Sequence, residues 1–232
     1  ELPKLLAEKC NEYDATLIHF STDYVFDGKS PVPYQETAPT NPINEYGRGK
    51  LLAEQEIQFK SSKYFIFRVS WLFGPYDNKG LVPRLIRNLY FKGKKAYALD
   101  AVRSSVTYIP DVVDMVSQLI VDTYEADQFK PPLPYDIYHY TTSDALSPME
   151  LSFLLRREML NRNIHRPRKD LGDSLEKLIA RPVAQEYNQE LVNQIGYQFP
   201  KYSAMSSEKI VSHYKSDFKP AIKDIKTVLD HY

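Results

Sequence analysis

The chain has 232 residues, of which 43% are hydrophobic and 26% are charged, and its thirty basic and thirty acidic side chains cancel. This composition excludes a disordered chain, a collagen-like repeat and a coiled coil. Without a net charge, no overall field attracts nucleic acid or an anionic membrane, so neither is expected as a partner. The single cysteine, Cys10, cannot form an intrachain disulfide, and no secretory signal or long apolar span is visible. We therefore expect a cytoplasmic protein.

Helical and strand patterns alternate along the first half of the chain. Leucines recur at helical spacing within residues 2–10, and the short apolar run of residues 16–20 is typical of a buried strand. A helix predicted over residues 44–60 leads into a second strand over residues 64–69, and a third helix is predicted over residues 81–92. Because helices usually connect parallel strands, this order predicts an α/β fold, a Rossmann-like parallel sheet with helices on both faces.

The same rhythm continues beyond the middle of the chain. A helix predicted over residues 111–124 leads into an alternating strand over residues 135–140. Ser147 is followed by a proline and, three residues on, by Glu150, which together indicate a capped helix start. Residues 161–200 are polar and broken by prolines, and the last helical stretches are predicted over residues 207–214 and 220–232.

Hydroxyl side chains follow the first predicted strand. Thr22 stands at the carboxyl end of this strand, where an open α/β sheet usually builds its ligand crevice. Tyr46 and Lys50 are four residues apart, so a helix places them on one face. We expect the Lys50 ammonium to favour the phenolate and to lower the pKa of Tyr46. A hydroxyl, a phenol and an ammonium suit the reduction of a ketone or the oxidation of an alcohol, although a tyrosine and a lysine at helical spacing also occur by chance.

Four motifs give the chain a family resemblance. They are STDYVFDG from residue 21, PYQET from residue 33, NPINEYGRGKLLAE from residue 41 and FRVSWLFG from residue 67. In order and spacing they resemble the extended short-chain dehydrogenase/reductases, and among these the dTDP-4-dehydrorhamnose reductases. The resemblance covers residues 16–113 and continues more weakly to the C-terminus. It implies reduction of a 4-keto nucleotide sugar with NADPH as the expected cofactor and NAD as the alternative.

The resemblance also implies roles for individual residues. The implied catalytic residues are Thr22, Tyr46 and Lys50. The implied cofactor-binding residues are Ser21, Tyr46, Lys50, Val69 and Ser70. The implied substrate-binding residues are Asp23, Tyr24, Trp71, Arg103 and Thr107. Trp71 is the only tryptophan, and from the residues alone a core position is at least as reasonable as a sugar contact. No metal site is expected, because the five histidines are scattered without ligand spacing.

Three features depart from the family pattern. Val106 stands where the family has a proline. Phe199 stands where the family has an arginine that would pair with a phosphate, unless Arg181 is the equivalent. The glycine-rich turn that binds the cofactor pyrophosphate is not visible, so we expect the N-terminal βαβ part to be missing. The strand over residues 16–20 is then expected to show an exposed flank.

Two domains follow from the pattern and the resemblance together. We expect a truncated Rossmann-like NAD(P)-binding domain over residues 1–145, with residues 75–110 contributing to the substrate side. A small, mainly helical substrate-binding lobe is expected over residues 146–232.

A non-catalytic function is the alternative interpretation. The resemblance extends to the regulatory subunit of methionine adenosyltransferase, which binds NADP and the methionine adenosyltransferase catalytic subunit. That subunit keeps the tyrosine-lysine pair, but it has a serine at the position of Thr22 and lacks the Ser70-Trp71 pair. Both differences favour the enzyme. A homodimer is a further expectation, as is a binding fragment without catalysis if no sequence precedes residue 1.

Overall fold

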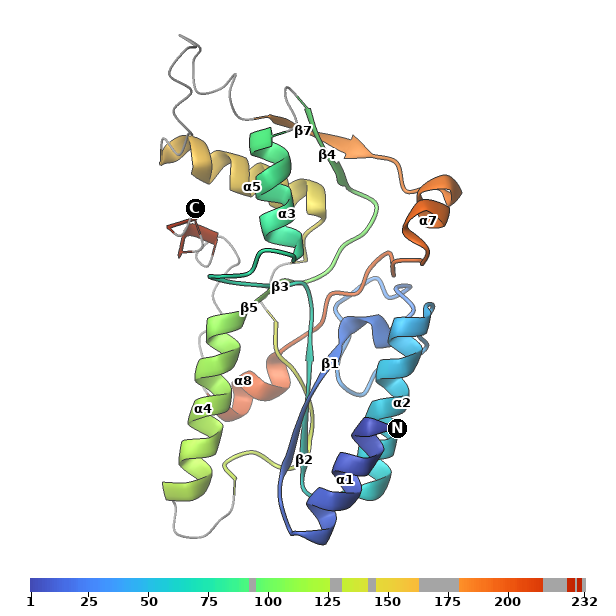
Figure 1. Cartoon of the computed structure of the whole chain (residues 1–232), viewed down its shortest axis with the longest axis vertical. Coiled ribbons are helices and arrows are strands. Elements are labelled where there is room, and N and C mark those ends of the chain that lie inside the picture. The colour runs from blue at the N-terminus through green and yellow to red at the C-terminus, as the bar shows by residue number, and fades with distance from the viewer. Residues whose placement is uncertain are drawn as a thin grey trace.

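The computed structural model describes residues 1–91, 95–125, 131–141, 145–162, 180–214, 225–227 and 229–230. Its central element is a three-stranded parallel sheet in the order β1-β2-β6 (Figure 1). The strands are β1 (Leu17–Thr22), β2 (Tyr64–Val69) and β6 (Asp136–His139). The predicted strands therefore form, and they pair in parallel as the pattern requires.

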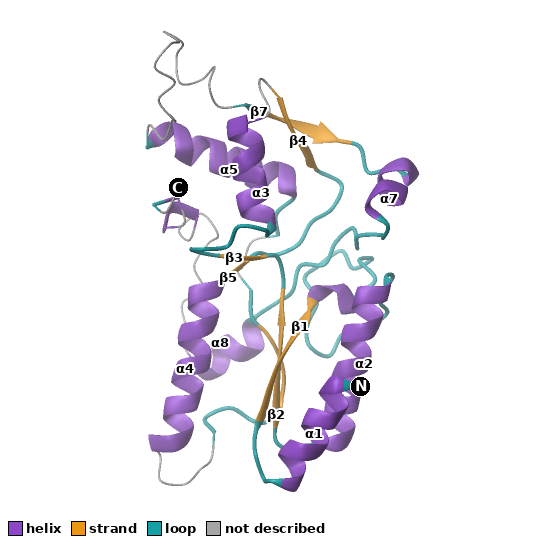
Figure 2. Ribbon diagram, in the orientation of Figure 1, coloured by secondary structure: helices purple, strands orange, loops and turns teal. Residues whose placement is uncertain are grey.

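Helices cover both faces of this sheet (Figure 2). On one face lie α1 (Leu2–Glu12) and α2 (Glu45–Lys60), and on the other lie α4 (Ile109–Glu125) and α8 (Glu208–Tyr214). Side chains of a strand alternate between the two faces of a sheet. Ile66 of β2 therefore packs against Ala7 of α1 and Ile57 of α2, whereas its neighbours Phe65 and Phe67 pack on the opposite face, toward α4. The predicted Rossmann-like arrangement is confirmed. We call this part the sheet lobe.

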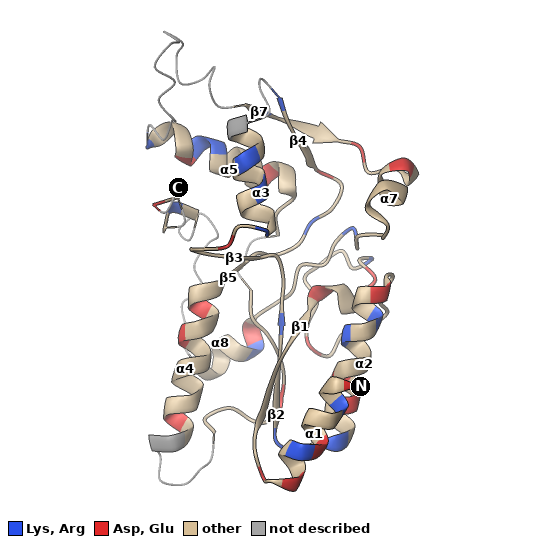
Figure 3. Cartoon of the chain, viewed as in Figure 1, with Lys and Arg blue, Asp and Glu red and all other residues tan. Residues whose placement is uncertain are grey.

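β1 is an edge strand among the described residues, since it pairs with β2 alone. Its first four residues are not fully buried, and Phe20 is 42% exposed. The predicted exposed flank is therefore present. Both basic and acidic residues are interspersed along α1 and α2 (Figure 3). In the part of the chain that the structure describes, no helix has the length and apolarity needed to cross a bilayer.

A second lobe lies beyond the carboxyl ends of the sheet strands (Figure 1). Its helices are α3 (Leu81–Phe91), α5 (Pro148–Asn161) and α7 (Gln189–Ile195), and its strands are β4 (Lys95–Leu99) and β7 (Arg181–Gln185), which pair in parallel. Between the lobes, β3 (Leu72–Phe73) pairs with β5 (Thr107–Tyr108). The lobe is thus helical with a two-stranded sheet, and residues 75–110 supply α3 and β4 to it.

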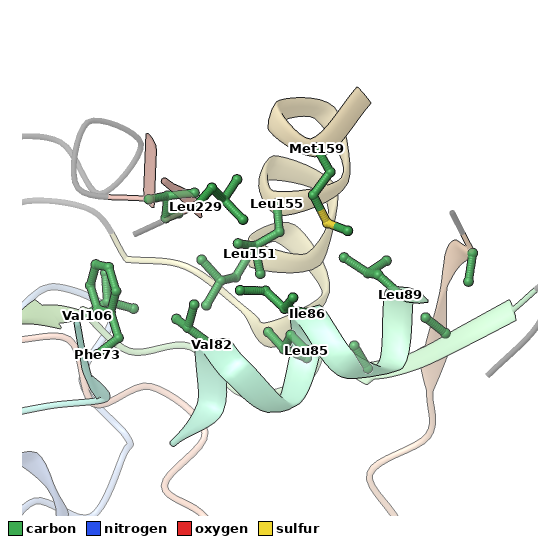
Figure 4. Packing of buried hydrophobic residues seen from close by; sticks show 14 of the residues in the cluster. Phe73, Val82, Leu85, Ile86, Leu89, Val106, Leu151, Leu155, Met159 and Leu229 are labelled. Atoms are coloured by element: carbon green, nitrogen blue, oxygen red, sulfur yellow. The ribbon is translucent and has the colours of Figure 1, made fainter. Parts of the chain in front are cut away.

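The core of the second lobe joins α3 and α5. Figure 4 shows Val82, Ile86 and Leu89 of α3 facing Leu151 and Leu155 of α5, all of them buried. The Ser147 hydroxyl accepts from the Glu150 N–H at 3.1 Å, and the Glu150 carboxylate accepts from the Ser147 N–H at 2.8 Å. The predicted capping box is confirmed.

Two predicted boundaries differ from the structure. α4 begins at Ile109 rather than after Pro110, because a proline in the first turn lacks only an N–H that the helix leaves unbonded anyway. Of the helix predicted over residues 220–232, residues 225–227 are helical and most of the remainder lies outside the described residues.

Candidate functional site

A cavity of about 1000 Å³ opens at the carboxyl ends of β1 and β2, between the sheet lobe and the second lobe. It is lined by the residues of both strand ends, by the first turns of α2 and by the chain after α7. The lining residues are Phe20, Ser21, Thr22, Asp23, Tyr24, Ile43, Asn44, Glu45, Tyr46, Arg48, Lys50, Val69, Ser70, Trp71, Leu72, Val192, Gly196, Tyr197 and Gln198. All three residues expected to be catalytic are among them.

Thr22 is placed by the turn that follows β1. Its hydroxyl caps the 3-10 helix η1 (Asp23–Val25) by accepting from the Tyr24 N–H at 3.2 Å. The same hydroxyl donates to Asp23 Oδ1 at 3.1 Å, and the Thr22 side chain also lies close enough to the Tyr46 phenol to lower the pKa of that group. The structure therefore brings the hydroxyl and the phenol together at one point of the cavity.

Close packing of α2 against η1 sets the position of Tyr46. Asn44 caps α2, since its Oδ1 accepts from the Gly47 N–H at 2.8 Å. A Cβ at Gly47 would lie 2.1 Å from the Tyr24 carbonyl oxygen, so only glycine permits this approach. The Tyr46 ring then meets the Tyr24 ring edge-on, with centroids 5.9 Å apart.

The electrostatics of Tyr46 differ from the expectation. The Lys50 ammonium donates to the Phe20 carbonyl at 2.8 Å, and burial lowers the pKa of Lys50. Burial and the Asp23 carboxylate raise the pKa of Tyr46, while the hydrogen bond to Thr22 opposes them. The prediction of a lowered Tyr46 pKa is therefore wrong, because burial dominates the pKa of the phenol and the Lys50 ammonium, which is bonded to the Phe20 carbonyl, is not among the groups that shift it. The phenol stays protonated, which is the form that donates a proton.

Asp23 is part of the cavity wall, and its side chain is almost fully buried. Its Oδ2 accepts from the hydroxyls of Ser104 at 2.9 Å and Ser203 at 2.5 Å, and burial raises the pKa of the carboxyl. Ser203 belongs to the C-terminal part of the chain, 180 residues away. Asp23 thus joins η1 to two distant segments.

Trp71 packs on the core and also lies at the cavity, while its contact with a sugar stays a prediction. Its ring packs on the core of the second lobe and also lines the cavity, where the Trp71 side chain acts to lower the pKa of the Tyr24 phenol. Burial and Asp23 nevertheless raise the pKa of Tyr24. The backbone φ of Trp71 is +36°, which is rare for a bulky residue. Such strain tends to occur at functional sites.

A row of polar side chains crosses the sheet beside the cavity. Ser21 of β1, Arg68 of β2 and His139 of β6 are neighbours in register. Arg68 forms two hydrogen bonds to Glu54 of α2, with Nε–Oε1 at 3.0 Å and Nη2–Oε2 at 2.6 Å, and the Ser21 hydroxyl donates to the same carboxylate. Glu54 lies one turn beyond Lys50, so this buried pair fixes the face of α2 that carries Lys50 and Tyr46.

The other expected cofactor and substrate residues are placed in two different ways. Val69 and Ser70 line the cavity, and the Ser70 hydroxyl pairs with that of Ser104 at 2.7 Å. Arg103 and Thr107 are not among the lining residues. Arg103 binds both carboxylate oxygens of Glu150, and Thr107 accepts from the Ser70 N–H at 3.2 Å while donating to the Tyr140 carbonyl. Their role in substrate binding stays a prediction.

The comparisons identify the family of the chain. The family model described as the RmlD substrate binding domain matches residues 1–232. The chain belongs to the RmlD substrate-binding family. No group of three or more histidine, cysteine or carboxylate side chains suited to a metal ion is found among the described residues of this RmlD domain.

Relatives of this RmlD domain include reductases and a methionine adenosyltransferase subunit. The dTDP-4-dehydrorhamnose reductase of Salmonella typhimurium is 44% identical over 73 residues, which are 32% of this chain and 24% of the relative. Methionine adenosyltransferase 2 subunit beta of Xenopus tropicalis is 30% identical over 149 residues, or 63% of this chain and 43% of that protein. The chain thus spans less than half the length of these curated relatives.

Solved structures agree on the fold of this RmlD domain. The crystal structure of dTDP-4-dehydrorhamnose reductase from Bacillus anthracis in complex with NADP superposes with a TM-score of 0.74 at 24% identity, covering 99% of this chain and 70% of that chain. This likeness supports the α/β architecture expected from the sequence.

The sequence missed the residues that the second lobe adds to this RmlD cavity. Val192, Gly196, Tyr197 and Gln198 line it, although they lie about 150 residues from Tyr46. One signal was available, because Gly196 ends a short helical pattern and adopts the left-handed φ of +81° that glycine favours at this position. The pattern does not reveal that the following tyrosine reaches the cavity.

Proposed function

We propose that this domain is the substrate side of an NADPH-dependent reductase of a 4-keto nucleotide sugar. The observation that carries the proposal is the meeting of Thr22 and Tyr46 at a cavity that Lys50 also lines. Similarity to named dTDP-4-dehydrorhamnose reductases supports it. The cytoplasm is the proposed location.

The proposed chemistry is a proton transfer coupled to hydride addition. The carbonyl oxygen of the substrate lies between the Thr22 hydroxyl and the Tyr46 phenol. The Thr22 hydroxyl turns from Asp23 Oδ1 to donate a hydrogen bond to this oxygen, and Tyr46 donates the proton that turns it into a hydroxyl. A raised pKa keeps this proton on Tyr46 at neutral pH. Asp23 and Trp71 hold Thr22 and Tyr24 in place around the substrate.

The donors on the strand side of the cavity fit a nicotinamide riboside. Lys50 offers an ammonium, Ser21 and Ser70 offer hydroxyls, and Val69 offers an apolar surface along the same wall. When bound, a reduced nicotinamide supplies the hydride to the carbonyl carbon. Lys50 would hold the ribose hydroxyls, and its side chain is already held at the strand end by the Phe20 carbonyl. NADPH is the proposed cofactor, with NAD as the alternative.

The experiment measures NADPH oxidation with dTDP-4-dehydrorhamnose in the natural protein that contains this chain. Tyr46→Phe removes the proton donor and keeps the ring, so turnover should fall about 100-fold to 10,000-fold while NADPH affinity stays unchanged. Tyr64→Phe is the matched control, because this tyrosine lies at the opposite end of β2 and outside the cavity lining. Equal turnover of Tyr46→Phe and the unaltered protein would contradict the proposal.

A regulatory function is retained as the second candidate, because methionine adenosyltransferase 2 subunit beta aligns with 63% of the chain. Under this alternative the natural protein binds NADP and a methionine adenosyltransferase catalytic subunit, and it reduces no keto sugar. Absence of turnover together with co-purification of a methionine adenosyltransferase would replace the first proposal. A homodimer is compatible with either candidate and is tested by light scattering.

A further inference from the structure

An array of aromatic rings runs from Tyr46 to the second lobe. The Tyr24 ring lies 5.9 Å from Tyr46 and 6.3 Å from Phe199, and Phe199 lies 5.0 Å from Tyr197, each measured between centroids. All three contacts are edge-on, at angles of 87°, 81° and 66°. Tyr46, Tyr24 and Tyr197 all line the cavity, so its aromatic wall continues from the reacting end to the second lobe.

Tyr197 is both accessible and supported from behind. Its side chain is exposed enough, at 45% for the residue, to offer a ring face to the cavity that it lines. Phe199 backs the ring, and Tyr187 in turn holds Phe199, because the Tyr187 hydroxyl accepts from the Phe199 N–H at 2.8 Å. An exposed ring on a rigid support is a suitable stacking surface, since little side-chain freedom is lost when a ligand binds.

The chain that carries Tyr197 is clamped to α2. Asn44 is 4% exposed, and its Nδ2 donates to the Gln198 carbonyl at 2.9 Å while its Oδ1 caps α2. One side chain thus fixes both the first turn of α2, which carries Tyr46, and the residue next to Tyr197. The distance between the reacting end and the aromatic end of the cavity is set by this amide.

The charges of the cavity are all on the sheet-lobe side. The charged lining residues are Asp23, Glu45, Arg48 and Lys50. Arg48 pairs with Glu45, and hydroxyl groups bind Asp23. The lining residues of the second lobe, in contrast, are uncharged. This end of the cavity therefore favours an uncharged, planar group over a phosphate.

We propose that Tyr197 is a specificity-determining residue, which stacks on the base of a nucleotide-sugar ligand, and that Asn44 is the positioning residue that holds it in register with Tyr46. The inference rests on the proposed function for the class of ligand. It depends on binding alone, so its test needs neither cofactor nor turnover.

The test is calorimetric titration of the natural protein with thymidine and, separately, with glucose 1-phosphate. Tyr197→Ala should weaken thymidine binding about tenfold or more, because stacking on an aromatic ring contributes strongly to base binding. Tyr197→Phe keeps the ring and should bind thymidine within about twofold of the unaltered protein. Tyr13→Ala is the control, since Tyr13 is an exposed tyrosine outside the cavity lining. Glucose 1-phosphate affinity should not change in any of these variants.

Asn44→Asp separates positioning from helix capping. Aspartate caps a helix as well as asparagine does, but it cannot donate to the Gln198 carbonyl. We expect unchanged helix content by circular dichroism and a loss of thymidine affinity close to that of Tyr197→Ala. The proposal is overturned if the unaltered protein does not bind thymidine, or if Tyr197→Ala binds it within about twofold. It is also overturned if both probes weaken equally. If thymidine binds as expected and no keto sugar is reduced, only the proposed function fails.

Discussion

The histidine of the polar row makes the stability of the fold depend on pH. His139 is fully buried, its Nδ1–H faces the carbonyls of Tyr34 at 3.1 Å and Ser206 at 3.2 Å, and its Nε2 lies 3.4 Å from Arg68 Nη1. Burial, and then the Arg68 guanidinium, lower the pKa of His139 from 6.5 to about 3. The imidazole is therefore neutral in the folded protein throughout the range in which an unfolded chain protonates it.

The size of the effect follows from this difference in pKa. Below pH 6.5, the unfolded state binds a proton that the folded state excludes, so the free energy of unfolding falls as the pH falls. The slope approaches about 1.4 kcal/mol per pH unit, which gives a loss of about 2 kcal/mol at pH ~5. This is a large fraction of a typical stability of about 5–15 kcal/mol.

Urea unfolding, followed by far-ultraviolet circular dichroism at pH ~7, ~6 and ~5, measures this loss. His139→Gln keeps a donor and an acceptor but does not titrate, so its stability should fall about 2 kcal/mol less over this range. Glu36 accepts a hydrogen bond from the backbone N–H of His139, and burial raises the pKa of Glu36. Because Glu36 is present in both proteins, its contribution to the pH dependence cancels when the two profiles are compared. Parallel pH profiles for the two proteins would show that His139 does not exclude the proton.

Two further predictions concern packing. Gly47→Ala places a Cβ 2.1 Å from the Tyr24 carbonyl and should lower the free energy of unfolding by about 1–3 kcal/mol, whereas Gly49→Ala meets nothing within 4 Å and should raise it by about 1 kcal/mol. Thermal unfolding checks both, and equal melting temperatures would refute the close approach of α2. Leu155→Ala should cost about 2–5 kcal/mol because the side chain is fully buried, and Phe153→Ala, at a residue 46% exposed on the same helix, should cost less than about 1 kcal/mol. Similar losses in urea unfolding would contradict the assigned core.

The sequence predicted the parts of the fold that depend on local patterns. β2 forms where an apolar run predicts a strand. α5 begins where Ser147 and Glu150 predict a capped helix start. β4 and β7 were missed, because each is only 5 residues long and β7 has no long apolar run. Pro182 within β7 further argues against a strand, although the residue lies in a two-stranded sheet, where every strand is an edge.

The same limit applies to the site. Thr22, Tyr46 and Lys50 were found because a strand end and a helical spacing place them locally. The pKa values of Tyr46 and Lys50 depend on burial in the folded protein, so the predicted direction for Tyr46 was wrong. Tyr197 reaches the cavity only through tertiary contacts, and these cannot be predicted from the spacing of residues in the sequence.

The contacts of Asn44 and Asp23 also determine when the cavity can form. Asn44 bonds to a residue 154 positions further along the chain, and Asp23 to one 180 positions further along. Contacts between residues so distant in sequence are slow to form, because a long loop must close before they contribute any stability. On the ribosome, the polar network around Tyr46 stays incomplete until residues near 200 have been synthesised. We therefore expect the three sheet strands with α1, α2 and α4 to fold first and the cavity to close in a later kinetic phase, which Trp71, the only tryptophan and a lining residue, reports by its fluorescence.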